Sequence, residues 1–259
     1  MGGRRQLFVL ATTVALALIV VAVVTTVLRA SRDQQVEAVP QGLPGPVLLV
    51  PGYGGSRGSL EQLAGVLRAA GREATVLTLP GDGTGPLDDD AQVLADAAQA
   101  AVDAGAPSVD VVGYSAGGVV ARLFVAEKNG GSLVRRVVTL GSPHHGTETA
   151  GLAAVLSPGS CPAACQELAP DSSLLGRLNR GDETPPGPLW VSVWTTDDEV
   201  VTPPSSARLD GALDAVVQEV CPGRRVEHGQ LPTDPAVQAL VLDALGTARP
   251  ALPSACPGT

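Results

Sequence analysis

From residue 47 onward, short apolar runs alternate with longer segments that carry apolar residues at helical spacing. The apolar runs are rich in valine and leucine, which is typical of strands that are buried on both faces. The expected strands cover residues 47–50, 75–79, 109–113, 134–140, 189–195 and 215–220. The expected helices cover residues 59–70, 88–104, 116–128 and 235–245. This order predicts an α/β fold with a mostly parallel six-stranded sheet and helices on both of its faces.

The first 30 residues differ from the rest of the chain. Residues 7–28 form an uncharged, mostly apolar run, with Arg4 and Arg5 before it and Arg29 after it. As a helix, these residues would span about 33 Å, enough to cross a bilayer. We expect residues 1–30 to be a transmembrane signal anchor or a cleaved signal peptide. The long apolar run and the lack of a small-x-small cleavage site favour the anchor.

Both alternatives for the N-terminus place the rest of the chain outside the cytoplasm. Residues 31–46 are polar and then rich in proline and glycine, as expected for a linker, and residues 47–259 form one predicted domain. Within that domain, residues 146–188 have an irregular pattern with one short helical stretch at 172–179. Such a segment between two strands is suited to substrate contacts or a small lid.

The exported part of the chain is strongly acidic. The full chain has a net charge of −9, and its first 30 residues hold three arginines and no acidic residue. The remainder therefore carries 14 basic and 26 acidic residues, a net charge of −12. This balance argues against a basic surface of the kind that binds nucleic acid or anionic lipid headgroups.

Four cysteines lie in the exported part, at Cys161, Cys165, Cys221 and Cys256. An even number in an oxidising compartment indicates two disulfides, for which three pairings exist. The short spacing from Cys161 to Cys165 favours a local bridge, which leaves Cys221 to pair with Cys256. A metal site is the weaker alternative, because the chain has no Cys-x-x-Cys and no histidine pair at the usual ligand spacing.

Residues 108–122 carry the strongest chemical signal in the chain. They contain a Gly-x-Ser-x-Gly pattern centred on Ser115, between an expected strand and an expected helix. Gly113 and Gly117 leave room for the strained turn of a nucleophile elbow, and the helix directs its first N–H groups toward negative charge beside the serine. Ser56 lies in a second Gly-x-Ser-x-Gly pattern, but there a glycine-rich loop separates the expected strand at 47–50 from the next expected helix. Ser115 is therefore the predicted nucleophile.

A nucleophilic serine needs a base, and the base needs a group that orients it. His228 is the predicted base, because it is the only histidine that follows every later acid candidate in the order serine, acid, histidine. His144 and His145 come too early in the chain. We expect them to hold their loop near the pocket by hydrogen bonds, in preference to binding a metal.

The acid is expected directly after the strand at 189–195. Asp198 is the predicted triad acid, because the apolar pair Val200–Val201 returns to the core and leaves the residue before it at the edge of the sheet. Asp197 is the alternative, and Glu199 is interpreted as a solvated surface charge.

An oxyanion hole needs two backbone N–H groups. One is expected from Ala116, the residue after the nucleophile. The other is expected from Tyr53, in the glycine-rich loop after the first strand, where glycines allow the main chain to approach a substrate carbonyl.

Taken in order, these segments resemble a bacterial α/β-hydrolase of the small lipase and esterase kind, over residues 46–245. The matching segments are VLLVPGYGG (47–55), LPGDGTG (79–85), VVGYSAGG (111–118), LGSPHHGT (140–147), TTDDEVV (195–201) and HGQL (228–231). The resemblance implies that Ser115, Asp198 and His228 form the triad. Pro51 departs from the pattern, since such lipases usually have a histidine before the first loop glycine. The domain also has no room for a large cap, which implies an open site.

The residues and the resemblance together predict an extracytoplasmic serine hydrolase that cleaves carboxylic esters, a lipase or esterase for small ester or lipid substrates, without metal or cofactor. Its expected membrane contact is through the N-terminal segment, and the sequence does not indicate an oligomeric state. Two alternatives stay open. One is a cell-envelope acyltransferase that uses the same triad. The other is a catalytically silent scaffold that binds lipid or a partner.

Overall fold

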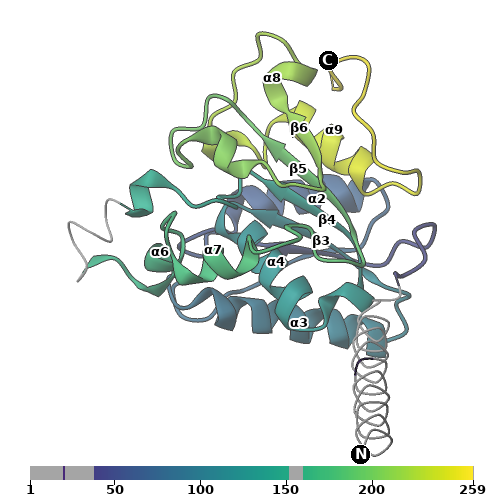
Figure 1. The fold of residues 1–259 in the computed structure, drawn as a ribbon. Coiled ribbons are helices and arrows are strands. Elements are labelled where there is room, and N and C mark those ends of the chain that lie inside the picture. Colours follow the sequence, from purple (N-terminus) through teal and green to yellow (C-terminus); the bar gives the residue numbers. More distant parts are fainter. Residues whose placement is uncertain (1–19, 21–37, 152–159, 259) are drawn as a thin grey trace, which may run out of the picture. The chain divides into compact units, whose positions relative to one another are not determined.

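Six parallel strands form one sheet in the order β2-β1-β3-β4-β5-β6 (Figure 1). The strands are β1 (Val47–Val50), β2 (Ala74–Val76), β3 (Val109–Tyr114), β4 (Val134–Leu140), β5 (Leu189–Trp194) and β6 (Leu213–Val216). Every pair of neighbouring strands is parallel, so the sheet is wholly parallel where the sequence predicted a mostly parallel one. The chain moves outward from β1 in one direction to β2 and then returns to β3. The C-terminal ends of β1 and β3 therefore flank the switch point where α/β sheets bind ligands.

Four long helices cover the two faces of the sheet, as predicted. They are α2 (Gly58–Ala69), α3 (Leu87–Asp103), α4 (Ala116–Glu127) and α9 (Pro235–Ala244). Buried side chains of α3 and α4 pack with Leu48 and Val111 on one face. Those of α2 and α9 pack with Leu49 and Val112 on the other. Alternate residues of the central strands thus point to opposite faces, and both faces are apolar.

This computed structural model describes residues 38–151 and 160–258, together with Val20. Residues 38–259 form one compact unit. The predicted anchor or signal peptide at residues 1–30, and residues 31–37 of the predicted linker, lie outside the described residues apart from Val20. Among the residues that are described, no helix has the length and apolar character needed to cross a membrane.

The shorter elements contain the main differences from the sequence prediction. They are η1 (Gly130–Ser132), α6 (Ala163–Glu167), α7 (Ser173–Leu178), η3 (Pro204–Ala207), α8 (Val217–Val220) and η4 (His228–Gln230). α7 matches the expected helical stretch, whereas α6 was not predicted. The strand predicted over 215–220 was wrong for four of its six residues, since β6 ends at Val216 and α8 covers Val217–Val220. Its three valines favour a strand by propensity, but the local tertiary contacts decide the outcome.

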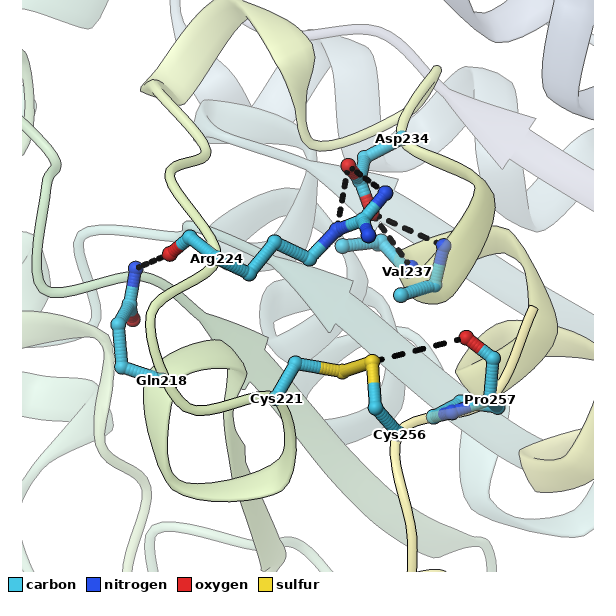
Figure 2. The surroundings of a disulfide bond; sticks show 8 residues. Gln218, Cys221, Arg224, Asp234, Val237, Cys256 and Pro257 are labelled. Carbon is cyan, nitrogen blue, oxygen red and sulfur yellow. Dashed lines mark hydrogen bonds and ion pairs between the residues drawn. A yellow bond between two sulfur atoms is a disulfide. The ribbon is translucent and has the colours of Figure 1, made fainter. Parts of the chain in front are cut away.

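Both predicted disulfides are present, Cys161–Cys165 and Cys221–Cys256. Figure 2 shows the second of these, which joins the segment after α8 to the C-terminal tail. Cys221 and Cys256 are 35 residues apart, whereas Cys161 and Cys165 are only four apart. In the chain-entropy model, closing the longer loop stabilises the fold by about 4 kcal/mol and closing the shorter one by about 2 kcal/mol.

A buried charge cluster stabilises the end of the sheet at which the strands begin. Asp110 on β3 is fully buried and accepts two hydrogen bonds from Arg135, at 2.9 and 2.6 Å, and one from Arg72, at 2.6 Å. Both guanidinium groups also donate to the carbonyl of Leu245, just past α9. The cluster therefore joins the last helix to the central strands.

We expect Asp110→Asn to lower the free energy of unfolding by about 3–5 kcal/mol, because it leaves two guanidinium groups without their carboxylate in a buried position. Urea unfolding with linear extrapolation measures the change. The matched control is Asp88→Asn, which removes the exposed partner of Lys128 and should change stability by less than about 1 kcal/mol. A similar small effect for Asp110→Asn would contradict the assigned role of the cluster.

Candidate active site

Ser115 occupies a strained turn between β3 and α4. Its φ of 53° lies in a region that residues other than glycine rarely adopt. The Ser115 N–H donates to the carbonyl of Leu140 at 2.8 Å, so the end of β4 holds the turn in place. This geometry is the elbow that the sequence predicted.

Glycines on either side of Ser115 allow the elbow to pack against the backbone of its neighbours. A Cβ at Gly117 would lie 2.3 Å from the carbonyl oxygen of Val50 at the end of β1. A Cβ at Gly113 would lie 2.5 Å from the carbonyl oxygen of Gly117. Larger side chains at either position would push the serine away from β1.

Ser115, His228 and Asp198 come together in one line of hydrogen bonds. The Ser115 Oγ lies 3.0 Å from His228 Nε2, and His228 Nδ1 lies 2.7 Å from Asp198 Oδ2. The side chains of His228 and Asp198 are both buried. A carboxylate only accepts, so the proton sits on Nδ1 and the Nε2 lone pair is free to accept from the serine hydroxyl.

The other oxygen of Asp198 is fixed by backbone groups. Asp198 Oδ1 accepts hydrogen bonds from Val200 N at 2.9 Å and from Val201 N at 2.8 Å. Gly141, with a φ of 55°, lies beside both side chains: a Cβ there would be 3.2 Å from Asp198 Oδ2 and 3.2 Å from His228 Nδ1. The carboxylate therefore keeps one orientation toward His228.

Tyr114 packs directly against His228. Its ring centroid lies 5.2 Å from that of His228, and its hydroxyl donates to the His228 carbonyl oxygen at 3.3 Å. Burial, reinforced by the charge of Asp198, raises the pKa of Tyr114 to about 12. The hydroxyl therefore stays protonated at neutral pH and remains a hydrogen-bond donor.

The alternative candidates lie apart from this line. Asp197 Oδ2 accepts from Gln218 Nε2 at 3.1 Å and from Val226 N at 3.3 Å, and no hydrogen bond to His228 is found among the described residues. Glu199 and Ser56 are exposed, as the sequence predicted for Glu199. The structure thus brings Asp198 to the histidine and leaves Asp197 beside it.

The two predicted oxyanion donors flank the serine. Ala116 is the first residue of α4, where helix N–H groups have no partner within the helix. The loop with Tyr53 comes close, because a Cβ at Gly52 would lie 2.9 Å from Ser115 Cβ. Within the described ranges, neither the Tyr53 N–H nor the Ala116 N–H donates to another residue. Both are therefore available to a ligand, and their role as oxyanion donors stays a prediction.

His144 and His145 stabilise the loop after β4 by hydrogen bonds, as expected. His144 is fully buried, with Nε2 3.1 Å from Thr139 Oγ1, and burial lowers its pKa well below the usual value. It is therefore neutral. His145 Nε2 lies 2.9 Å from Glu183 Oε1. Burial by itself would raise the pKa of Glu183, but hydrogen bonds from Asp210 N–H and from His145 outweigh it and lower the pKa.

Arg122 is a residue of this site that the sequence reasoning missed. It is fully buried on α4 and donates to the carbonyls of His144, Leu178 and Glu183. Burial lowers its pKa to about 10, so it keeps its charge at neutral pH. An arginine inside the otherwise apolar helix at 119–125 was the signal that could have revealed it. Arg122 joins the nucleophile helix to the loops around the pocket.

A cavity of about 290 Å³ opens beside Ser115 and Tyr53. Its walls include Pro143, Thr147, Cys165, Leu168, Val200 and Val201. None of the described residues that line it is charged. Part of the wall comes from α6, within the segment that the sequence predicted to supply substrate contacts. In the part of the chain that the structure describes, no cluster of three or more possible metal ligands occurs.

The sequence model of the alpha/beta hydrolase family matches residues 47–255. The chain belongs to this family. A search of curated proteins finds no significant match. Among solved structures, the hydrolase resembles Aspergillus fumigatus lipase B, with a TM-score of 0.66 and 21% identity over 81% of this chain and 54% of that one. It thus spans about half the length of that lipase.

Two further structures show the same fold. Bacillus licheniformis lipase BlEst2 in its mature form has a TM-score of 0.64 and 18% identity, covering 81% of this chain and 94% of that one. The monoacylglycerol lipase of Paleococcus ferrophilus has a TM-score of 0.55 and 14% identity, covering 78% of this chain and 96% of that one. The hydrolase fold, without evidence of a large cap, is therefore confirmed.

We expect Asp198→Asn to lower kcat for p-nitrophenyl butyrate by about 10⁴-fold, because the amide would favour the wrong tautomer of His228. Asp197→Asn keeps an oxygen for its two donors and should lower kcat by less than tenfold. Steady-state kinetics of the two variants compares neighbouring residues directly. A larger loss for Asp197→Asn would reverse the assignment of the acid.

Proposed function

We propose that this hydrolase cleaves carboxylic esters, as a lipase or esterase, through Ser115, His228 and Asp198. The observation that carries the proposal is the continuous line of hydrogen bonds from Ser115 Oγ to His228 Nε2, at 3.0 Å, and from His228 Nδ1 to Asp198 Oδ2, at 2.7 Å. A serine hydroxyl is a poor nucleophile until a positioned base removes its proton. This arrangement supplies the base and holds it in the required tautomer.

In the acylation step, Ser115 Oγ attacks the carbonyl carbon of the ester while its proton passes to His228 Nε2. The carbonyl oxygen takes up the electron pair as an oxyanion, which the N–H groups of Tyr53 and Ala116 stabilise. When this intermediate collapses, the ester C–O bond breaks. His228 then returns the proton to the departing alkoxide, and the acyl group stays on Ser115.

In the deacylation step, a water molecule replaces the alcohol. His228 Nε2 takes a proton from that water as its oxygen attacks the acyl carbon, and the oxyanion forms at the same two N–H groups. Collapse breaks the bond to Ser115 Oγ, which recovers its proton from His228. The products are a carboxylic acid, an alcohol and the free enzyme.

The cavity supports an uncharged acyl group as substrate. A volume of about 290 Å³ lies at the lower end of the range that small-molecule pockets occupy. Because the lining lacks charge, a neutral chain of short or medium length fits it best. Lipases among the structures of the same fold agree with such a substrate.

We place the activity outside the cytoplasm, with the protein anchored by its N-terminal segment or secreted. The apolar run at residues 7–28 supports export of the domain. The two disulfides support an oxidising compartment.

Hydrolysis of p-nitrophenyl esters from acetate to palmitate by residues 31–259 tests the proposal. We expect kcat/KM to rise by about fourfold for each added methylene, because each buried methylene contributes about 0.8 kcal/mol, and to level off once the acyl chain fills the cavity. Ser115→Ala should lower kcat by about 10⁵- to 10⁶-fold.

The matched control is Ser56→Ala, which changes the exposed serine of the second Gly-x-Ser-x-Gly pattern and should keep full activity. Thermal unfolding of both variants checks that the fold is intact. Activity that survives Ser115→Ala would contradict the assigned nucleophile, and no turnover of any ester would contradict the proposed reaction.

A further inference from the structure

The side-chain amide of Gln218 joins two loops. The loop of the acid follows β5 and carries Asp198, and the loop of the base follows α8 and carries His228. Gln218 on α8 donates from Nε2 to Thr195 Oγ1 at 2.8 Å, to Asp197 Oδ2 at 3.1 Å and to the Arg224 carbonyl oxygen at 3.3 Å. Its Oε1 accepts from Thr196 N at 2.9 Å. Residues 195–197 immediately precede Asp198, and Arg224 lies shortly before His228. Gln218 therefore contacts both loops at once.

Two hydrogen-bond partners of Gln218 in the loop of the acid, Thr195 and Asp197, also bond directly to the loop of the base. The Thr195 hydroxyl donates to the Val226 carbonyl oxygen at 2.7 Å, and Asp197 Oδ2 accepts from Val226 N at 3.3 Å. Val226 is fully buried, two residues before His228. Both of its backbone polar groups are thus held by side chains from the loop of the acid.

The loop of the base is also fixed on its far side, as Figure 2 shows. Arg224 forms an ion pair with Asp234, with its Nη2 2.7 Å from Asp234 Oδ2. Asp234 caps α9 by accepting from Ala236 N and Val237 N. The Cys221–Cys256 disulfide holds the start of this segment. Because α9 and the disulfide hold this segment, the hydrogen bond from Gln218 to the Arg224 carbonyl ties Gln218 to a fixed part of the chain.

We propose that Gln218 is a positioning residue that sets the separation of Asp198 from His228. Its hydrogen bonds are not to Ser115, His228 or Asp198, so it acts through the two loops it joins. Asp198 and His228 are 30 positions apart in the chain, and their loops follow different elements. Without Gln218, only the bonds of Thr195 and Asp197 to Val226 would still join these loops, and the 2.7 Å contact that orients the base would loosen. This inference rests on the proposed role of His228 as base.

A fluorophosphonate probe measures the geometry of the base without depending on the choice of ester. Ser115 Oγ attacks the phosphorus and its proton passes to His228; the Oγ–P bond forms as the P–F bond breaks, and fluoride leaves. We expect Gln218→Ala to lower the labelling rate and kcat by about 10- to 100-fold. KM should stay within about threefold, since Gln218 does not line the cavity.

A reciprocal pair of variants separates positioning from packing. Gln218→Glu has the same shape but faces Asp197 with a like charge, so its loss should be at least as large as that of Gln218→Ala. Adding Asp197→Asn removes one of the two facing negative charges, and the amide oxygen introduced at position 197 can still accept from Val226 N. We expect the double variant to label at least about fivefold faster than Gln218→Glu alone.

The control is Gln92→Ala on α3, which removes one exposed hydrogen bond to Asp96 and should leave labelling unchanged. Labelling of folded Gln218→Ala at the wild-type rate would overturn the inference. So would a double variant without recovery. If Gln218→Ala does not fold, the comparison of Gln218→Glu with the double variant decides. Wild-type protein that is not labelled at all would overturn the proposed function as well, which distinguishes that failure from the others.

Discussion

The close approach of the Ser115 turn to the end of β1 is the constraint on which the site depends. Only glycine fits at position 117, because the Cβ of any other residue there would lie 2.3 Å from the Val50 carbonyl oxygen. This contact places the start of α4 beside the loop that follows β1. Ser115 and Tyr53 consequently line one cavity at the switch point of the sheet, next to the start of α4.

The two ends of the sheet differ in structure: one holds a buried charge cluster, and the other holds the candidate active site. Where the strands begin, Asp110 accepts from the guanidinium groups of Arg72 and Arg135, which also hold the segment after the last helix against the sheet. Where the strands end, the serine is strained and amide groups are left open. The carbonyl of Leu140 and the close backbone contact at Gly117 hold the strained turn, so the surrounding structure determines its conformation.

The sequence was sufficient to predict features that depend on local pattern or chain order. The buried strands show as apolar runs, the strained turn as glycines around Ser115, and the histidine that contacts Ser115 as the last one in the chain. Long-range side-chain contacts left no such pattern. The turn from β6 into α8 brings Gln218 to the two loops, yet the valines around it indicated a strand. Asp197 and Asp198 differ by one position, so the backbone N–H groups of Val200 and Val201 were needed to show which carboxylate faces His228.

The central claim is that Ser115 alone is activated, by His228 oriented on Asp198. Peptide mapping by mass spectrometry after reaction with a fluorophosphonate tests it most directly. The account predicts one modified residue, Ser115, with modification lost in His228→Ala. Modification of another serine, equal labelling in the absence of His228, or no labelling of the folded protein would contradict it.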